Sequence, residues 1–298
     1  MLRTLTLSCS LALLGACAAP DPAPTPVEYT EPGTWPLSVT HDDLEREAIL
    51  YVPESWSPDA PTPVLLNFHG YGGTMEDHME EADFRPIADE EGFVVVVPQG
   101  SLLEGSPHWN NSAPSDDNKS DADDFGFVEA LLERVGELVP VDADRVYAVG
   151  YSNGGMMSFG LSCYRSELIA AIGSVSGAML DDIGVGCTPG PTSVITLHGT
   201  ADYVLPYGGA EGMQSAMGVV DYWNDVNQIT GAPTETTSSS GGSTVESFVY
   251  VGGTGGTEVH HHRVVDGGHV WLDVNVDGAD TNRLLWNFFS RFGRDGAL

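Results

Sequence analysis

Residues 141–158 read VDADRVYAVGYSNGGMMS, and this stretch decides the fold. The apolar run Arg145 to Val149 predicts a strand, and a helical pattern begins near Asn153. Between them, Gly150-Tyr151-Ser152-Asn153-Gly154 matches G-x-S-x-G, in which glycines flank a serine because a sharp strand-to-helix turn leaves no room for Cβ atoms. In a chain with 36 glycines the motif alone arises readily by chance, so its strand-and-helix context carries the prediction. Ser152 is therefore a candidate nucleophile.

Similar apolar runs recur on both sides of this stretch and are typical of strands buried on both faces. They alternate with helical patterns, which predicts the α/β class: a mostly parallel central sheet with helices on both faces and right-handed crossovers. Two antiparallel strands near 37–40 and 46–52 are expected to open the sheet. Residues 231–256 are predicted to be loop around one strand at 247–251. The other predicted strands are 64–68, 93–97, 170–175 and 194–197, and the helices are 76–90, 124–138, 153–166, 213–228 and 280–292.

A serine hydroxyl becomes a good nucleophile when a positioned base takes its proton. His269 stands in a Gly-rich turn between a predicted strand and the last helix, which is where such a base is expected. Asp202 follows the strand 194–197 and is expected to orient the histidine, because the chain order Ser, Asp, His suits this kind of sheet. Asp266 is the alternative acid, although so close a sequence neighbour seldom reaches the ring of His269.

The negative charge that develops on a carbonyl oxygen under attack needs hydrogen-bond donors. The expected donors are the backbone N–H groups of Asn153, directly after the serine, and of Tyr71, in the sequence HGYGG after the first long strand. A plain Gly-rich turn is the alternative interpretation of that second segment.

The chain resembles the secreted polyhydroxybutyrate depolymerase and feruloyl esterase group, which is related to carbohydrate esterase family 1 in the α/β-hydrolase superfamily. The resemblance implies a serine carboxylic-ester hydrolase that forms an acyl-enzyme, uses Ser152, Asp202 and His269, needs no cofactor and has no large cap domain. It also implies a bridge between Cys163 and Cys187. It is carried by HGYGGT (69–74), EEGFVVVVPQG (90–100), HWN (108–110), DDFGFVEALLERV (123–135), VDADRVYAVGYSNGGMMS (141–158), LHGTADYVLPYGG (197–209), DGGHVW (266–271) and NRLLWNFFSRF (282–292).

One departure from that group concerns the substrate. The group commonly has Thr-Trp-Pro after its histidine, whereas this chain has Val270, Trp271 and Leu272, so a different substrate rim is expected. Trp109 and Trp271 are the candidate rim residues, and buried core tryptophans are the alternative. The absence of a polymer-binding module in this sequence also argues against attack on a polymer.

The N-terminal residues predict export. Residues 1–17 read as a lipoprotein-type signal peptide ending in Leu-Gly-Ala-Cys, with Cys17 as the expected lipidated residue; an ordinary signal peptide cut near Ala19 is the alternative. Residues 18–36 are expected to form a Pro- and acid-rich tether, and residues 37–298 the catalytic domain. An extracytoplasmic, membrane-anchored monomer is the expectation. Cys163 and Cys187 are then a disulfide candidate, with two unpaired buried thiols as the alternative.

The amino-acid composition argues against some classes of binding partner. The chain has 43 acidic and 11 basic residues and a formal net charge of −32, which argues against binding to nucleic acid or an anionic polymer. The charge reflects either ordinary solvation or adaptation to salt. No metal is predicted: residues 273–278 resemble the start of a calcium loop, but position twelve falls on Leu284, and adjacent histidines 260–262 on a strand face opposite ways. Asp123 and Asp124 are expected to cap a helix.

Two other functions share parts of this pattern. Prolyl-oligopeptidase-like serine peptidases also combine G-x-S-x-G-G with an Asp-x-x-x-Pro segment, but they carry a large gating domain for which this chain has no room. A glycan-binding lipoprotein with a relic site is disfavoured, because all three residues of the predicted triad are present.

Overall fold

The structure is a computed structural model that describes residues 30–112, 120–181, 183 and 187–298. The predicted signal peptide, Cys17 and most of the predicted tether lie outside these residues. Within the described chain, no helix is both long and apolar enough to cross a membrane. The first strand begins at Gly33, so residues 33–36, predicted to be tether, belong to the folded domain instead.

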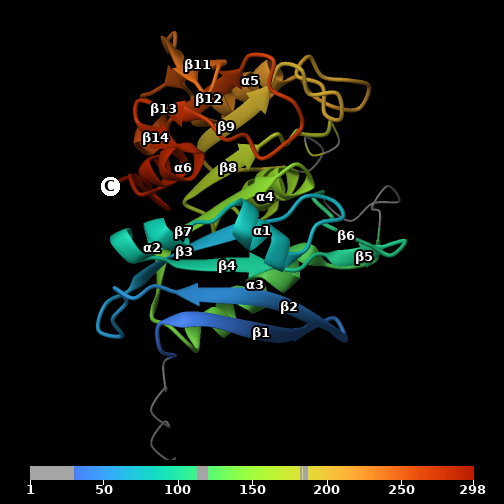
Figure 1. The fold of residues 1–298 in the computed structure, drawn as a ribbon, viewed down its shortest axis with the longest axis vertical. Coiled ribbons are helices and arrows are strands. Elements are labelled where there is room, and N and C mark those ends of the chain that lie inside the picture. The colour runs from blue at the N-terminus through green and yellow to red at the C-terminus, as the bar shows by residue number, and fades with distance from the viewer. Residues whose placement is uncertain (1–29, 113–119, 182, 184–186) are drawn as a thin grey trace, which may run out of the picture.

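A ten-stranded sheet forms the centre, in the order β1-β2-β4-β3-β7-β8-β9-β12-β11-β10 (Figure 1). The strands from β4 to β12 in this order pair in parallel, while β1–β2 and β10–β11 form antiparallel edges. The predicted mostly parallel sheet is confirmed. The strands are β1 (Gly33–His41), β2 (Leu44–Val52), β3 (Thr62–Phe68), β4 (Val94–Pro98), β7 (Val141–Tyr151), β8 (Ala171–Val175), β9 (Ser193–Gly199), β10 (Thr234–Ser240), β11 (Ser243–Tyr250) and β12 (Val259–Val264).

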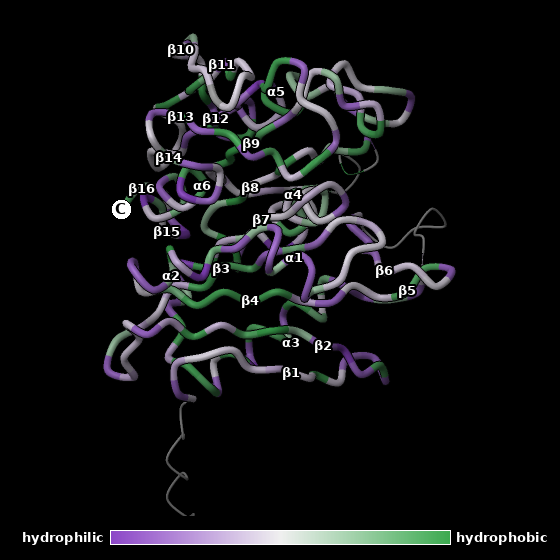
Figure 2. Tube along the Cα trace, in the orientation of Figure 1, coloured by the Kyte–Doolittle hydropathy of each residue, from purple (hydrophilic) through white to green (hydrophobic). Residues whose placement is uncertain are grey.

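Helices cover both faces of the sheet, as predicted. One apolar core lies between the sheet and α3 (Asp124–Gly136), α4 (Asn153–Tyr164) and α5 (Ala216–Asn227). A second core lies under α1 (Met75–Glu81), α2 (Arg85–Glu91) and α6 (Thr281–Phe289). The strands β3, β4, β8 and β9 are buried along their whole length, and β4 stands out as apolar in Figure 2. Successive side chains of such a strand point into the two cores in turn, which explains why these strands do not alternate polar and apolar residues.

Two sequence predictions were wrong in detail. The helix expected at 76–90 is divided into α1 and α2, because Pro86 lacks a backbone N–H and begins a new helix instead of continuing the first. The stretch expected to be loop with one strand at 247–251 is a hairpin of β10 and β11. Gly241 and Gly242 both have positive φ in its turn, which suits a two-residue hairpin, and the many serines and threonines are the residues of an edge strand.

The disulfide between Cys163 and Cys187 is formed, so this prediction is confirmed. It joins the C-terminal end of α4 to the segment that precedes β9, across a sequence separation of 24 residues. In the chain-entropy model a loop of this size stabilises the fold by about 3 kcal/mol. The bridge therefore fixes the C-terminal end of α4, the helix that follows Ser152.

Buried histidines on β12 make stability depend on pH. Burial lowers the pKa of His262 to about 3, and its Nδ1 forms a hydrogen bond with the Ser247 hydroxyl. The unfolded chain takes up the proton near pH 6.5, so between these values it binds one more proton than the folded state. The free energy of unfolding therefore falls with falling pH, by about 1.4 kcal/mol per unit for one such group.

We expect His262→Leu to remove this contribution. The slope of unfolding free energy between pH 6 and pH 4, measured by urea unfolding, should be smaller in the variant by about 1.4 kcal/mol per pH unit. A slope equal to that of the wild type would show that His262 is protonated in the folded protein over this range.

Candidate active site

The turn between β7 and α4 has the geometry that G-x-S-x-G predicts. Ser152 lies between the two elements with φ 52° and ψ −118°, a conformation that costs a non-glycine residue about 1–3 kcal/mol. A Cβ on Gly150 would lie 2.3 Å from the carbonyl carbon of Gly154, and one on Gly154 would lie 2.1 Å from the carbonyl oxygen of Phe68. Only glycine fits at these two positions, and the serine is thereby held above the end of the sheet.

The three predicted triad residues come together at this edge. The Ser152 hydroxyl lies 2.9 Å from Nε2 of His269, and Nδ1 of His269 lies 2.7 Å from Oδ2 of Asp202. A carboxylate only accepts, so Nδ1 carries a proton and Nε2 accepts from the serine. The arrangement can remove the serine proton and stabilise the imidazolium that results.

Asp202 is buried, and its carboxylate is fully hydrogen-bonded. Its Oδ1 accepts from the backbone N–H groups of Val204 and Leu205, both at 2.9 Å. Burial by itself would raise the pKa of Asp202, but the hydrogen bonds from His198, His269 and Leu205 outweigh it and hold the pKa well below its usual range. The carboxylate is therefore charged at neutral pH. Asp266, the alternative acid, is exposed, and no hydrogen bond in the described structure joins it to His269.

The loop that carries His269 is tied down by contacts that sequence reasoning missed. The Tyr151 hydroxyl donates to the carbonyl oxygen of His269 at 2.9 Å, and the Ser176 hydroxyl donates to that of Val270 at 2.8 Å. The backbone N–H of Ala201 donates to the carbonyl of Gly267 at 2.9 Å. The base thus has a fixed position relative to both the serine loop and the Asp202 loop.

The loop after β3 brings Tyr71 to the serine. A Cβ on Gly70 would lie 3.4 Å from Cβ of Ser152. The backbone N–H groups of Gly72 and Gly73 already donate, to Pro107 and Gly70. Among the described residues, neither the N–H of Tyr71 nor that of Asn153 has a protein acceptor, so both remain available to a substrate oxygen.

Buried His69 fixes the direction of the Tyr71 amide. Its Nδ1–H donates to the carbonyl of Gly70 at 2.7 Å, and its Nε2 accepts from the N–H of Gly100 at 2.9 Å. In a trans peptide the C=O and the following N–H point in opposite directions, so anchoring the Gly70 carbonyl aims the Tyr71 N–H. Burial lowers the pKa of His69 to about 4, which keeps the ring neutral and able to accept at pH 7.

Trp109 is not a rim residue, and this prediction is corrected. Its side chain is 0% exposed, and its indole N–H donates to the carbonyl of His69 at 2.9 Å. Its backbone N–H and C=O both bind the side-chain amide of Asn153. Trp109 therefore links the two segments that carry the predicted oxyanion donors, the loop after His69 and the turn at Asn153. A buried indole N–H needs a hydrogen-bond acceptor. Here the acceptor is the carbonyl of His69, which is far from Trp109 in the sequence but close to it in the fold.

Trp271 is 9% exposed and packs edge-on against His78. It lines a cavity of about 260 Å³ together with Glu81, Asp273 and Asp280. A direct role at the rim remains a prediction for this residue. Four other apolar or aromatic side chains have exposures of 50–85%, and in the sequence they lie within two residues of Asp202 or His269 or in the predicted oxyanion loop. We name them the collar: Tyr71, Tyr203, Val204 and Val270.

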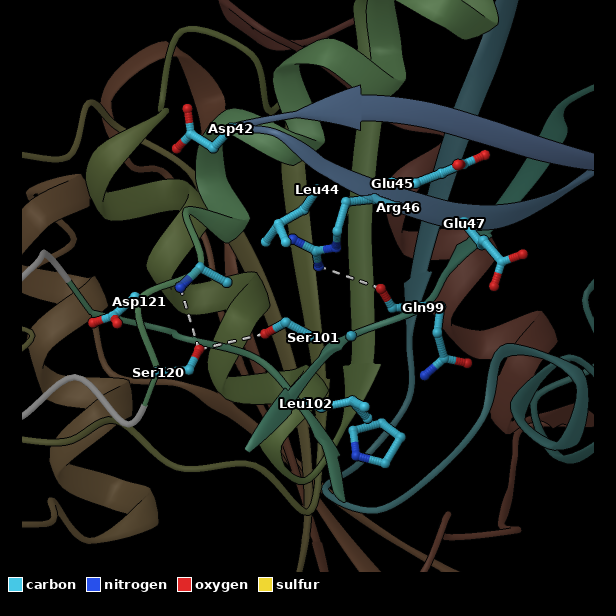
Figure 3. A pocket seen from close by; sticks show the side chains of 13 residues that line it. Asp42, Leu44, Glu45, Arg46, Glu47, Gln99, Ser101, Leu102, Ser120 and Asp121 are labelled. Atoms are coloured by element: carbon cyan, nitrogen blue, oxygen red, sulfur yellow. Dashed lines mark hydrogen bonds between the residues drawn. The ribbon is translucent and has the colours of Figure 1, made fainter. Parts of the chain in front are cut away.

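A cavity of about 740 Å³ lies beyond the carboxyl end of β4 (Figure 3). Its walls come from Asp42 and the start of β2, the segment from Gln99 to Leu102, Pro107 and residues 120–122. Acidic and apolar side chains both line it. Arg46 points into it but pairs with buried Asp124 at 2.7 Å. Asp124 thus forms an internal ion pair in addition to its place at the start of α3.

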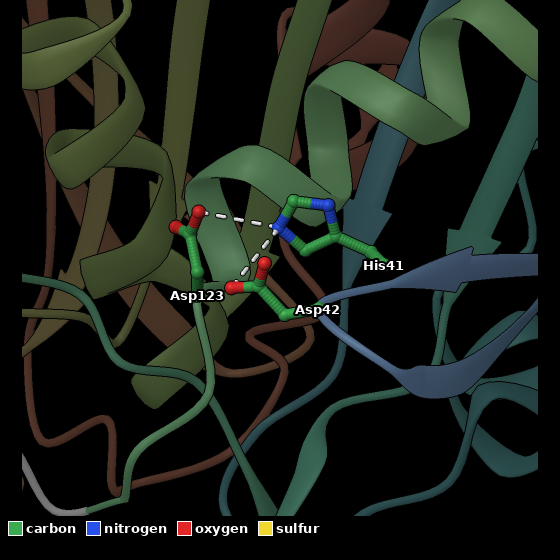
Figure 4. A group of neighbouring side chains, drawn as sticks. All are labelled: His41, Asp42 and Asp123. Atoms are coloured by element: carbon green, nitrogen blue, oxygen red, sulfur yellow. Dashed lines mark hydrogen bonds and ion pairs between the residues drawn. The ribbon is translucent and has the colours of Figure 1, made fainter.

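The other predicted polar clusters have structural roles. Asp123 caps α3 by accepting from Gly126, as predicted, and its second oxygen lies 3.2 Å from Nε2 of His41, with Asp42 beside them (Figure 4). In the calcium-like segment, Asp280 accepts from Arg283 and so caps α6. On β12, neighbouring histidines bind different partners: His261 pairs with Thr196 and His262 with Ser247.

The chain is similar in sequence and in fold to known proteins. The protein NocK of Nocardia uniformis subsp. tsuyamanensis is 30% identical over 203 residues, which make up 66% of this chain but only 55% of NocK. Feruloyl esterase C of Emericella nidulans is 29% identical over 248 residues, 82% of this chain and 83% of that protein. The solved acetyl xylan esterase from Aspergillus awamori has a TM-score of 0.64 at 15% identity, covering 86% of this chain and 99% of its own, which confirms the predicted α/β-hydrolase fold.

The family model of the phospholipases and carboxylesterases matches residues 56–233, more than half of the chain. The match includes β3 with the predicted oxyanion loop, the turn at Ser152 and the turn at Asp202, while His269 lies beyond it. The chain therefore belongs to the phospholipase/carboxylesterase family.

Proposed function

We propose that this protein is a serine carboxylic-ester hydrolase that works through an acyl-enzyme. The observation that carries the proposal is the continuous set of hydrogen bonds from the Ser152 hydroxyl through His269 to Asp202, with distances of 2.9 and 2.7 Å. Family membership supports the same reaction class.

In the first half-reaction, Nε2 of His269 takes the proton of Ser152 as the serine Oγ attacks the ester carbonyl carbon. The carbonyl oxygen becomes an oxyanion that accepts from the N–H groups of Tyr71 and Asn153. Each such donor contributes about 10²–10³-fold to kcat in comparable sites. His269 then gives its proton to the leaving alkoxide oxygen, the carbon–oxygen bond breaks, and the alcohol departs.

In the second half-reaction, water takes the place of the alcohol. His269 removes a proton from the water as its oxygen attacks the acyl carbon, and the same two amides hold the second oxyanion. Collapse of this intermediate breaks the bond to Ser152, which recovers its proton from His269. The carboxylic acid leaves, and the protein returns to its starting state.

For the substrate, we propose an uncharged ester with an aromatic or apolar group beside the scissile bond, of the feruloyl or acetylated-xylan kind. The exposed collar supports this choice, because aromatic and aliphatic side chains on the loops that carry Tyr71, Asp202 and His269 favour an apolar partner. The names of the relatives point the same way. The net charge of −32 disfavours a polyanionic substrate.

Initial rates on a panel of esters test this function. The panel holds p-nitrophenyl acetate and butyrate, methyl ferulate, acetylated xylan and a 3-hydroxybutyrate oligomer, with a prolyl p-nitroanilide as the peptidase control. We expect turnover of the esters and none of the anilide. Hydrolysis of the anilide alone would favour the peptidase, and binding of xylan without any turnover would favour the glycan-binding alternative.

Tyr203 is the most exposed member of the collar, at 85%, and directly follows Asp202. We expect Tyr203→Ala to raise KM for methyl ferulate about 10-fold, because the variant loses one aromatic contact and the area that this contact buries. KM for ethyl acetate, which has no aromatic group, should change less than about 2-fold. The matched control is Trp35→Ala, which removes an exposed aromatic ring from the outermost strand β1. Equal changes for both esters, or for both variants, would rule out a contact between Tyr203 and the aromatic group.

We also propose that the protein is exported and acts as a lipid-anchored monomer. The Cys163–Cys187 disulfide supports export, because such bonds persist in oxidising compartments. The proposed anchor is Cys17, and incorporation of labelled palmitate into the expressed protein tests it. A mature protein that lacks Cys17 and carries no label would contradict the anchor.

A further inference from the structure

A second histidine lies beside the carboxylate of Asp202. His198 is on β9, one residue before the end of that strand at Gly199, and its side chain is almost fully buried. Its Nε2 lies 2.8 Å from the carbonyl oxygen of Leu205 and 3.4 Å from Oδ2 of Asp202. Neither the reaction nor the family assignment given above requires a histidine at this place.

The hydrogen-bond chemistry fixes the proton on this ring. A carbonyl oxygen only accepts, so Nε2 of His198 must carry the hydrogen. The short contact shows that Leu205 receives the main hydrogen bond, while the longer one directs the same N–H toward Asp202. His198 therefore presents a donor, and not a competing base, to the carboxylate.

The contact closes the turn that holds Asp202. Oδ1 of the carboxylate accepts from the N–H groups of Val204 and Leu205, and the carbonyl of Leu205 accepts from His198. Two side chains thus hold the 202–205 turn: the carboxylate of Asp202 within the turn, and His198 on the neighbouring strand β9. With Oδ1 occupied in this way, Oδ2 faces His269, which is the orientation that the proton transfer needs.

Packing leaves His198 little freedom to turn away. The ring of Tyr207 meets it edge-on at 5.8 Å. The Tyr207 hydroxyl lies 2.8 Å from Nε2 of His261, and Nδ1 of His261 lies 2.7 Å from the hydroxyl of Thr196. These hydrogen bonds hold Tyr207 against His198. A polar network behind the active site therefore sets the position of the imidazole.

We propose that His198 is a positioning residue for the reaction: it acts through Asp202, by fixing the 202–205 turn so that the carboxylate stays aligned with His269. This inference rests on the proposed ester hydrolase function. Residues that act through a neighbour of the reacting atoms change the rate of the chemical step and leave substrate binding largely unaffected.

Steady-state kinetics on p-nitrophenyl acetate test the proposal with three variants. We expect His198→Leu to lower kcat about 10-fold with KM within about 2-fold of the wild type. His198→Gln keeps a nitrogen donor at nearly the same reach and should recover most of kcat. The control is His262→Leu, which removes an equally buried histidine from β12 and should leave kcat unchanged whatever it does to the melting temperature.

A double-mutant comparison separates positioning from general stability. In an Asp202→Asn background, His198→Leu should have almost no further effect on kcat, because its effect passes through the carboxylate. An additive 10-fold loss in that background, or equal losses in the leucine and glutamine variants, would overturn the proposal. If the wild type itself hydrolyses no ester, the proposed function fails; normal wild-type turnover with an unchanged His198→Leu kcat contradicts the positioning role alone.

Discussion

Ser152→Ala is expected to lower kcat/KM by about 10⁵-fold or more on every ester that the wild type hydrolyses. Alanine has no hydroxyl to attack the carbonyl carbon, so neither the acyl-enzyme nor its hydrolysis can occur. The activity that remains should come only from substrate binding and from the Tyr71 and Asn153 amides acting on direct attack by water. Initial rates on p-nitrophenyl butyrate, with the wild type at matched concentration, measure the ratio.

The matched control is Ser162→Ala on the same helix, α4. The hydroxyl of Ser162 is buried and has no hydrogen-bond partner among the described residues, so its loss should change turnover less than about 2-fold. Circular dichroism and the melting temperature show that both variants are folded. If Ser152→Ala kept more than about 1% of wild-type kcat/KM, another group would be the nucleophile.

Asp202→Asn has the second-largest expected effect, a fall in kcat of about 10⁴-fold. An amide can offer its NH₂ group to Nδ1 of His269, which would place the ring proton on Nε2, the atom that must accept from Ser152. The amide also lacks the charge that stabilises the imidazolium. Because the pKa of Asp202 is held below its usual range, the wild-type carboxylate is ionised at neutral pH.

Asp266→Asn is the control for this variant, because Asp266 is the other acid near His269 in the sequence. It is exposed and has a backbone contact to Thr200, so we expect kcat within about 2-fold of the wild type. The result to look for is a large difference between the two asparagine variants. A greater loss in Asp266→Asn than in Asp202→Asn would reassign the acid.

Most of the fold could be predicted from the sequence, and so could the three residues that the structure joins by hydrogen bonds, because each has a local signature. Ser152 lies between flanking glycines, and Asp202 and His269 follow apolar runs whose carboxyl ends meet at one edge of the sheet. Two elements were predicted wrongly. The helix at 76–90 was predicted as one helix because the effect of Pro86 was overlooked. The β10–β11 hairpin was predicted as loop around one strand because the polar strand β10 has no apolar pattern.

The residues that hold the triad in place could not be predicted in this way. Tyr151 and Ser176 contact a loop 118 and 94 residues away, and such contacts leave no local pattern. Trp109 was misjudged for the same reason, since a tryptophan beside a site and one beneath it look alike in sequence. His198 was visible in the segment LHGTAD, but only the structure reveals its contact with Leu205.

Covalent labelling tests the central claim most directly and needs no knowledge of the natural ester. The protein is incubated with diethyl p-nitrophenyl phosphate, digested and analysed by tandem mass spectrometry. We predict one diethylphosphoryl group on Ser152, released p-nitrophenol in equal amount, and no label in Ser152→Ala. A label on a different residue, or none on the folded wild-type protein, would contradict the assignment of Ser152 as an activated nucleophile.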